Sequence, residues 1–355
     1  MELMQKTIEE IKPLDEYARI KAREHLDSLI KPIGSLGKLE ELAIQIAGIT
    51  GKVNNTFERK CTIVMAADNG IHEEGVSSCP QNITAMQTEN FTKGICGINV
   101  LSKHAGAEVA IVDIGVNGEL NAEGIINRKL CHGTKNMAKE PAMTREQAIK
   151  AIETGIEIAT DLVNKGCRLL GTGEMGICNT STSSAVLMVL TGISAEVAVG
   201  KGAGLTASDF ENKKRVIERA ISINKPNKDD VIDVIAKVGG LDIAGIVGCY
   251  LAAAKLRVPI VIDGFISMVA ALAAYRINSL AREYMIPSHC SDEPGYKQAS
   301  QALGLEPILN LNMRLGEGTG CPLAFNIIEA SQAIVANMAT FEQATLNNDY
   351  LVDIR

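Results

Sequence analysis

Short apolar runs recur along the middle of the chain, and most of them end in an acidic residue or a glycine or are followed directly by one. Six runs have this form: residues 61–68, 108–115, 167–170, 196–199, 258–262 and 285–289. Runs of this length without polar alternation are typical of strands that are buried on both faces of a parallel sheet. The pattern therefore predicts six strands.

Between these runs, apolar residues recur at helical spacing. The helices that this spacing predicts cover residues 13–30, 39–48, 84–101, 144–164, 185–190, 241–254 and 321–339. Thr144 and Gln147 have the spacing of a capping box at the start of the longest one. Alternating strands and helices predict an α/β fold, a parallel sheet with helices on both faces. The first 50 or so residues predict only helices.

Composition and charge exclude several classes of protein. A length of 355 residues favours two domains, or one large domain with an attachment. The net charge of −7 argues against nucleic acid as a partner, because phosphate backbones bind basic surfaces. Nine scattered cysteines and five unclustered histidines predict no metal site. Residues 1–13 lack an apolar leader run, which favours the cytoplasm, and Asp263 interrupts the most apolar stretch, which argues against a membrane span.

Acidic residues lie at or just beyond the carboxyl ends of four of the predicted strands. These residues are Asp68, Asp113, Glu174 and Asp263. Ligands of open parallel sheets bind outside the carboxyl ends of the strands. Each acid alone is more simply a helix cap or a solvated loop residue. Together they favour a shared ligand cleft at one edge of the sheet.

Two glycine-rich stretches have the features of an anion site. Residues 173–184 combine glycines with a cluster of hydroxyl side chains before an apolar helix, and residues 200–204 form a second glycine-rich bend. Backbone N–H groups at a helix N-terminus bind phosphate well, and Lys213 or Lys214 follows on a helix. The alternative is hydroxyl capping without a ligand. The Walker pattern is absent, which argues against an ATPase.

The turn at residues 314–320 places one carboxylate among three glycines. Glu317 lies between Gly316 and Gly318, with Gly320 close behind. Glycines let a ligand approach the main chain, and a carboxylate in such a turn is a candidate general base. The alternative is a glycine-rich turn with a solvated glutamate.

Taken together and in order, these stretches resemble the nicotinate-nucleotide–dimethylbenzimidazole phosphoribosyltransferase family of cobamide assembly. The matching stretches are residues 31–37 (KPIGSLG), 67–70 (ADNG), 74–77, 99–101, 112–116, 173–176 (GEMG), 263–265 (DGF), 293–295 (EPG) and 314–320 (RLGEGTG). The resemblance implies a six-stranded parallel sheet in a Rossmann-like three-layer fold. It also implies a small helical domain from residues 1–60 and 305–355 beside a large domain of residues 61–304.

The resemblance implies a reaction without a cofactor. The enzyme moves 5-phosphoribose from nicotinate mononucleotide to a lower-ligand base, releases nicotinate and inverts the anomeric carbon to give an α-ribotide. Glu317 matches the glutamate that takes the proton of the incoming base. The resemblance also implies a homodimer in which the small domain of one subunit covers the cleft of the other.

The resemblance also implies roles for other side chains. The phosphate is expected at Gly176, Ile177, Cys178, Asn179, Thr180, Gly202, Ala203 and Lys213. Nicotinate and ribose are expected near Glu174, Asp263, Gly264, Phe265, Ser291 and Gly320. The base pocket is expected to contain Ser78, Cys79, Met86 and Leu315.

Two positions differ from the family pattern. Met86 follows Thr84-Ala85 where the family has a glutamine in the base pocket, and Asn69 stands in place of a histidine. A thioether adds apolar surface and removes an amide that could bond an azole nitrogen. A branch of the family accepts phenol or p-cresol and pairs unlike subunits. The sequence therefore leaves two substrates open for the incoming base, dimethylbenzimidazole and a phenol such as p-cresol. It also leaves open whether the chain forms a homodimer or a heterodimer. The alternative to an active enzyme is a catalytically silent partner subunit of such a heterodimer.

Overall fold

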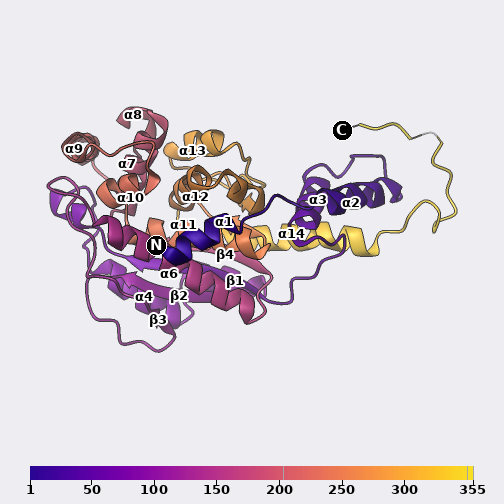
Figure 1. Cartoon of the computed structure of the whole chain (residues 1–355), viewed down its shortest axis with the longest axis horizontal. Coiled ribbons are helices and arrows are strands. Elements are labelled where there is room, and N and C mark those ends of the chain that lie inside the picture. Colours follow the sequence, from indigo (N-terminus) through magenta and orange to yellow (C-terminus); the bar gives the residue numbers. More distant parts are fainter. Residues whose placement is uncertain (203, 350, 355) are drawn as a thin grey trace.

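A single sheet of six parallel strands forms the centre of the computed structural model, which describes residues 1–202, 204–349 and 351–354. The strand order is β3-β2-β1-β4-β5-β6, and Figure 1 labels β1 to β4 of this sheet. The strands are β1 (Lys60–Ala67), β2 (Glu108–Gly115), β3 (Ile125–Asn127), β4 (Leu169–Met175), β5 (Ile260–Ile262) and β6 (Met285–Pro287). The predicted α/β fold class is confirmed.

Helices cover both faces of the sheet, because successive strand residues point to opposite sides. On β1, Ile63 and Met65 pack into the core that contains α11 (Leu241–Leu256). Val64, between them, packs with Phe91 and Ile98 of α4 (Ile83–Thr92) and α5 (Gly97–His104). The apolar residues of α14 (Gly320–Asn337) pack on β4 and β5. The sheet is therefore buried on both sides, as its uniformly apolar strands require.

The remaining helices complete the layers around α11 and the sheet. They are α1 (Glu2–Glu9), α6 (Arg145–Asn164), α7 (Asn179–Thr191), α8 (Ala195–Ala198), α9 (Ala207–Asn224), α10 (Val231–Val238), α12 (Phe265–Ile277) and α13 (Gly295–Leu303). The predicted capping box of α6 is confirmed, since the Gln147 N–H donates to Thr144 Oγ1 at 3.1 Å and the Thr144 N–H donates to Gln147 Oε1 at 2.9 Å.

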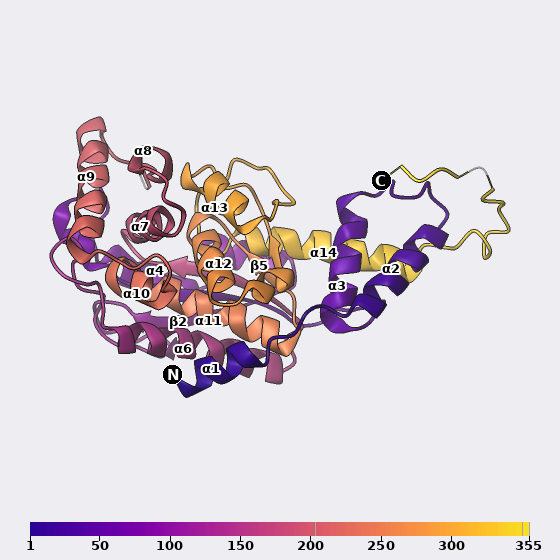
Figure 2. The ribbon, with the colours of Figure 1, turned by 45° about the horizontal axis from the view of Figure 1, so that its top comes forward.

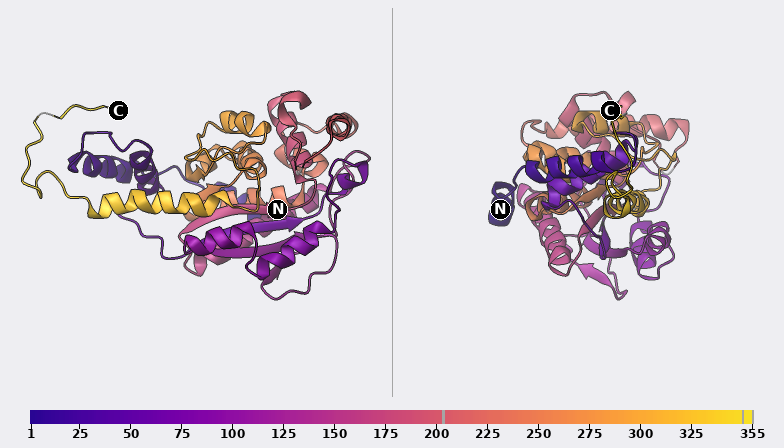
Figure 3. Two further views of the ribbon diagram at one scale, coloured as in Figure 1. Left: turned by 180° about the vertical axis from the view of Figure 1, so that it is seen from behind. Right: turned by 90° about the vertical axis from the view of Figure 1, so that its right-hand side faces the viewer.

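A helical extension projects from one side of the sheet (Figures 2 and 3). It consists of α2 (Glu16–Ser28), α3 (Lys38–Thr50) and the distal part of α14, joined by a small apolar core that includes Leu26, Ala43 and Val335. The first helix, α1, packs instead on α6 and α11. The domain boundaries at residues 60 and 305 stay a prediction.

Two predicted elements are wrong. Residues 196–199 do not form a strand, because residues 195–198 form the short helix α8, and β3 at the sheet edge supplies the sixth strand. So short an apolar run does not distinguish a strand from a helical turn. The single helix predicted for residues 84–101 is divided into α4 and α5. Gly94, with φ +72°, ends the first of them in a left-handed conformation that favours glycine.

Strand β4 continues beyond the predicted end at Leu170 to Met175. Its two internal glycines are needed for close approach: a Cβ on Gly171 would lie 2.7 Å from Cys321 Cβ of α14, and one on Gly173 would lie 2.5 Å from the Glu317 carbonyl oxygen. Glycines inside a strand often mark such contacts. They bring the turn that carries Glu317 directly onto the end of β4.

Candidate active site

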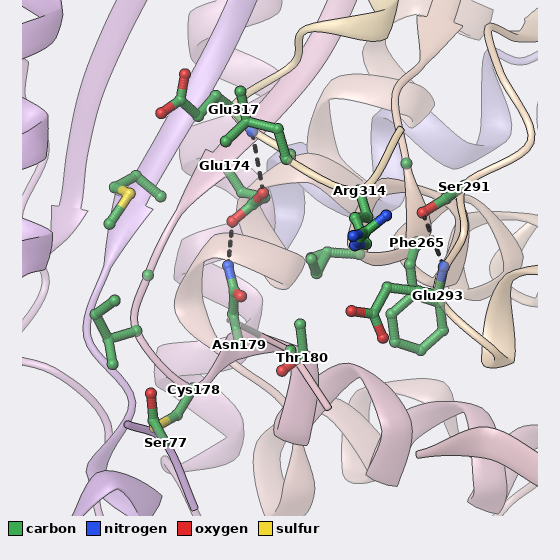
Figure 4. Close-up of a pocket in the computed structure, with 18 of the residues that line it drawn as sticks. Ser77, Glu174, Cys178, Asn179, Thr180, Phe265, Ser291, Glu293, Arg314 and Glu317 are labelled. Carbon is green, nitrogen blue, oxygen red and sulfur yellow. Dashed lines mark hydrogen bonds between the residues drawn. The ribbon is translucent and has the colours of Figure 1, made fainter. Parts of the chain in front are cut away.

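A cavity of about 360 Å³ opens at the carboxyl ends of β4 and β5, next to β1 (Figure 4). The chain changes direction along the sheet between β1 and β4, and such switch points are where α/β sheets bind ligands. Of the acids predicted to share a cleft, Glu174 and Asp263 line the cavity. Asp68 and Asp113 are buried at the same edge but are not among the described lining residues.

Glu317 lies in a turn whose backbone is held in left-handed conformations. Its φ is +63°, and those of Gly316 and Gly318 are +82° and +91°. A Cβ on Gly318 would lie 2.6 Å from Thr62 Cγ2 on β1. Glycine alone fits these neighbouring positions, and the non-glycine Glu317 adopts its conformation because the surrounding contacts impose it.

The Glu317 carboxylate is held by one donor from α4 and one from α5. Its Oε1 accepts from Gln87 Nε2 at 2.7 Å, and its Oε2 accepts from the Ile98 N–H at 3.3 Å. The side chain is 7% exposed, and its own N–H donates to Glu174 Oε1 at 3.3 Å. An oriented carboxylate in a sheltered cavity is what a general base requires.

Asp263 fixes the same turn from the end of β5. Its Oδ2 accepts from the Gly318 N–H at 2.9 Å and its Oδ1 accepts from the Gly320 N–H at 2.7 Å. Burial raises the pKa of Asp263 to about 7. Because both N–H groups belong to residues just after Glu317, Asp263 fixes the position of the turn that carries Glu317 relative to β5.

The N-terminus of α7 forms another wall of the cavity, with residues 176–180 lining it. Lys213 of α9 is buried behind this wall, where its Nζ donates to Thr180 Oγ1 at 2.9 Å and to the Gly200 carbonyl at 3.0 Å. Burial lowers the pKa of Lys213 to about 8. The neighbouring Lys214 pairs with Glu196 instead. The structure thus places Lys213, and not Lys214, at the α7 terminus.

Most of the other predicted residues also line the cavity. They are Ser78, Gly202, Gly264, Phe265, Ser291 and Leu315. Ala203 lies outside the described residues. Gly320 supports the cavity from behind, since its N–H bonds to Asp263 and a Cβ there would lie 2.2 Å from His289 Nδ1. Cys79 is not among the lining residues that the structure describes.

The structure does not place Met86 in the cavity. Met86 is 54% exposed, whereas the next residue, Gln87, lines the cavity and bonds to Glu317. Successive residues of a helix point about 100° apart, so only one of the two can face the site. The base pocket was expected to lack a glutamine amide because of Met86. The cavity does contain one, from Gln87, and this residue was not predicted from the sequence.

The sequence is similar to known proteins over nearly its whole length. A family model described as "Phosphoribosyltransferase" matches residues 11–346. The nicotinate-nucleotide–dimethylbenzimidazole phosphoribosyltransferases of Clostridium tetani and Clostridium perfringens (strain ATCC 13124) are 57% and 50% identical, over 100% and 99% of this chain and 98% of each relative. The chain belongs to this family. The family model spans every residue assigned to the cavity and leaves out only the two ends of the chain.

The solved structures agree with this family assignment. The nicotinate-nucleotide–dimethylbenzimidazole phosphoribosyltransferase from Thermus thermophilus superposes with a TM-score of 0.89 at 36% identity, covering 94% of this chain and 100% of that one. This chain therefore has the same fold as a solved phosphoribosyltransferase of its family.

Two further features of this phosphoribosyltransferase concern membranes and metals. Among the described residues, none of the helices is long and apolar enough to cross a membrane. The same part of the chain contains no group of three or more His, Cys, Asp or Glu side chains arranged to hold a metal ion.

Proposed function

We propose that the chain transfers 5-phosphoribose from nicotinate mononucleotide to a lower-ligand base, releasing nicotinate and forming an α-ribotide. The observation that carries this proposal is the Glu317 carboxylate, which is held by Gln87 and Ile98 inside a cavity whose opposite wall is the α7 N-terminus. A proton acceptor and an anion cradle in one cavity are what a phosphoribosyl transfer needs.

The phosphate is proposed to bind at the α7 N-terminus. Residues 176–180 and Gly202 line that wall, and the dipole of α7 favours an anion at its N-terminus. The Lys213 ammonium adds a positive charge through Thr180. This arrangement orients the ribose so that its anomeric carbon faces the turn of Glu317.

The chemical step needs alignment and one proton transfer. The base nitrogen forms a bond to the anomeric carbon while the bond to the pyridine nitrogen of nicotinate breaks. That pyridine nitrogen is cationic in the substrate and leaves as a neutral ring. The N–H proton of the incoming azole passes to Glu317. Positioning the two partners supplies much of the rate, and the base supplies the rest.

Gln87 supports an azole as the preferred base. Its amide lies in the cavity beside Glu317, where it can hydrogen-bond a heteroaromatic ring. The argument for a phenol relied on Met86, which faces solvent. We therefore propose dimethylbenzimidazole, or a similar benzimidazole, as the substrate.

We expect the variant Gln87→Met to lower turnover with benzimidazoles by about tenfold, because it removes the hydrogen bond to the charged Glu317 carboxylate. It should also lower the ratio of azole to phenol products, because it removes the amide that can hydrogen-bond an azole ring. The neighbouring Met86→Gln provides the control and should leave this ratio unchanged. Product ratios from competing bases measure the effect. A change with Met86→Gln alone would contradict this assignment.

We also propose a homodimer. Large apolar side chains are exposed on the Glu317 turn and on the neighbouring start of α5: Leu315, Ile95 and Val100. The two segments are in contact, since a Cβ on Gly97 of α5 would lie 2.9 Å from Leu315 Cδ2. Exposed apolar groups that gather in this way are typical of protein interfaces. The α2–α3 extension projects away from the sheet (Figure 2), and we propose that it covers the cavity of a second copy.

We expect the chain, expressed alone, to sediment as a dimer, and Ile95→Glu to shift it toward monomer because a charge would be buried at the interface. Ile223→Glu, on an exposed position of α9, is the matched control and should stay dimeric. A wild-type chain that is monomeric at micromolar concentration would refute the homodimer.

The function itself is tested by incubating the protein with nicotinate mononucleotide and dimethylbenzimidazole. We expect equal amounts of nicotinate and benzimidazole riboside 5′-phosphate.

A further inference from the structure

The cavity is rich in acid for a site that is proposed to bind an anionic nucleotide. Four carboxyl groups line it, those of Glu174, Asp263, Glu293 and Glu317, beside the cations of Lys201 and Arg314. Nicotinate mononucleotide carries a phosphate and a carboxylate of its own. If every lining carboxyl were ionised, their charges would oppose binding.

A fifth carboxyl group, that of Asp242 at the start of α11, is fully buried behind this wall. Its Oδ2 accepts a hydrogen bond from Asn179 Nδ2 at 3.2 Å, and its Oδ1 accepts from the Ile243 N–H at 2.9 Å. The same Asn179 Nδ2 donates to Glu174 Oε2. One amide therefore joins Asp242 to Glu174.

Glu174 in turn contacts the turn of the candidate base. Its Oε1 accepts from the Glu317 N–H at 3.3 Å, and a Cβ on Gly316 would lie 2.5 Å from that oxygen (Figure 4). A continuous set of hydrogen bonds thus runs from Asp242 through Asn179 and Glu174 to the Glu317 backbone.

The charges around Glu174 all have the same sign. Asp242 faces it from α11, Asp263 from the end of β5 and Glu317 from the turn before α14; Asp68, at the end of β1, acts on Asp242. Burial, followed by the charge of Asp242, raises the pKa of Glu174 to about 8. Burial raises the pKa of Asp242 to about 6. Both carboxyl groups are therefore harder to ionise than usual, and Glu174 more so than Asp242, which favours a state with the proton on Glu174 and the negative charge on Asp242.

We propose that Asp242 is a positioning residue that keeps Glu174 in its carboxylic-acid form, and that this neutral Glu174 admits an anionic nucleotide beside Glu317. This inference rests on the proposed function. It assigns a role to a residue that touches neither substrate nor cavity.

The protonation of Glu174 can be measured directly. The infrared carbonyl band of a protonated carboxyl group should appear in the difference between wild type and Glu174→Gln at neutral pH, and should disappear as pH rises through about 8. In Asp242→Asn the pH at which the band disappears should be lower than in wild type by about one unit or more, because removing a like charge lowers the pKa of Glu174. An unchanged midpoint, or no band in wild type at neutral pH, would overturn the proposal. A spectroscopic readout is needed because the pKa of Lys213 is also lowered to about 8.

Kinetics test the consequence. Just below the pKa of Glu174, Asp242→Asn should raise the KM for nicotinate mononucleotide about three- to tenfold with a smaller change in kcat, since a shift of one unit alters the ionised fraction by up to tenfold. Adding Glu174→Gln to this variant should return KM to the value of Glu174→Gln alone. Asp113→Asn, a buried aspartate at the same sheet edge, is the control and should keep the wild-type KM.

The outcomes separate this inference from the proposed function. A wild type that forms no riboside from nicotinate mononucleotide refutes the function. A wild type that forms the riboside, with a KM that Asp242→Asn leaves unchanged, refutes only the inference. If Asp242→Asn does not fold, Glu174→Gln decides alone. Loss of nucleotide binding at neutral pH in this neutral variant would overturn the proposal, as would a loss through about pH 8 equal to that of wild type. A smaller loss than in wild type would support it, because the loss due to Lys213 is common to both proteins.

Discussion

Replacing Glu317 with glutamine should lower kcat by about 10²–10⁴-fold, the usual contribution of a positioned proton acceptor. Glutamine has the same shape, so the turn should stay in place through the hydrogen bonds from Gly318 and Gly320 to Asp263. It cannot take up the proton of the incoming base. The KM for nicotinate mononucleotide should change little, because the phosphate wall is made by other residues.

Steady-state kinetics with dimethylbenzimidazole measure this effect. Glu89→Gln is the matched control: Glu89 follows Gln87 by two residues on α4, and its carboxylate bonds at the surface to the Asn121 N–H at 3.3 Å. The control should have wild-type turnover. Wild-type turnover in Glu317→Gln would show that another group accepts the proton.

Replacing Lys213 with alanine should weaken binding of nicotinate mononucleotide by about 10- to 150-fold, equivalent to about 1.5–3 kcal/mol for a hydrogen bond that involves a charged group. Free nicotinate lacks the phosphate, so its affinity should be unaffected. The ammonium loses its proton as pH rises through about 8, and nucleotide affinity should therefore fall over this range. That part of the pH dependence should be absent in the variant.

Lys214→Ala offers a close comparison, because Lys214 is the next residue but pairs with Glu196 and Glu211 on the outer side of α9. It should bind the nucleotide as wild type does. Titration calorimetry with nicotinate mononucleotide and with nicotinate separates the two ligands. An equal loss of affinity for both would mean that Lys213 has a structural role and does not serve the phosphate.

The sequence predicted the sheet well where apolar runs were long. Strands β1 and β2 match their predicted limits closely, because all eight residues of β1 and the last six of β2 are buried in the sheet. Strand β3 has only three residues at the edge and leaves no such pattern. The extent of β4 beyond Leu170 depends on how closely Glu317 and Cys321 approach its glycines, which is a tertiary contact that local sequence does not encode.

The candidate site was predicted best where glycines mark a special backbone. Glu317 stands out in the sequence because glycines surround it, and the α7 terminus stands out through its hydroxyl cluster. Gln87 and Asp242 carry no such signal. One lies within an ordinary helix and the other begins a buried one, and only the packing of α4 and α11 against β4 brings them to Glu317 and Glu174.

The central claim is that Glu317 accepts a proton while phosphoribose moves from nicotinate to an azole. Its most direct test is one incubation of the wild type and Glu317→Gln with nicotinate mononucleotide, dimethylbenzimidazole and p-cresol, with the products identified by mass and anomeric configuration. We expect wild type to release nicotinate and an α-linked benzimidazole ribotide in equal amounts, and Glu317→Gln to form about 10²–10⁴-fold less of both. Nicotinate release without a ribotide, a β-linked product, or equal rates for the two proteins would contradict the claim.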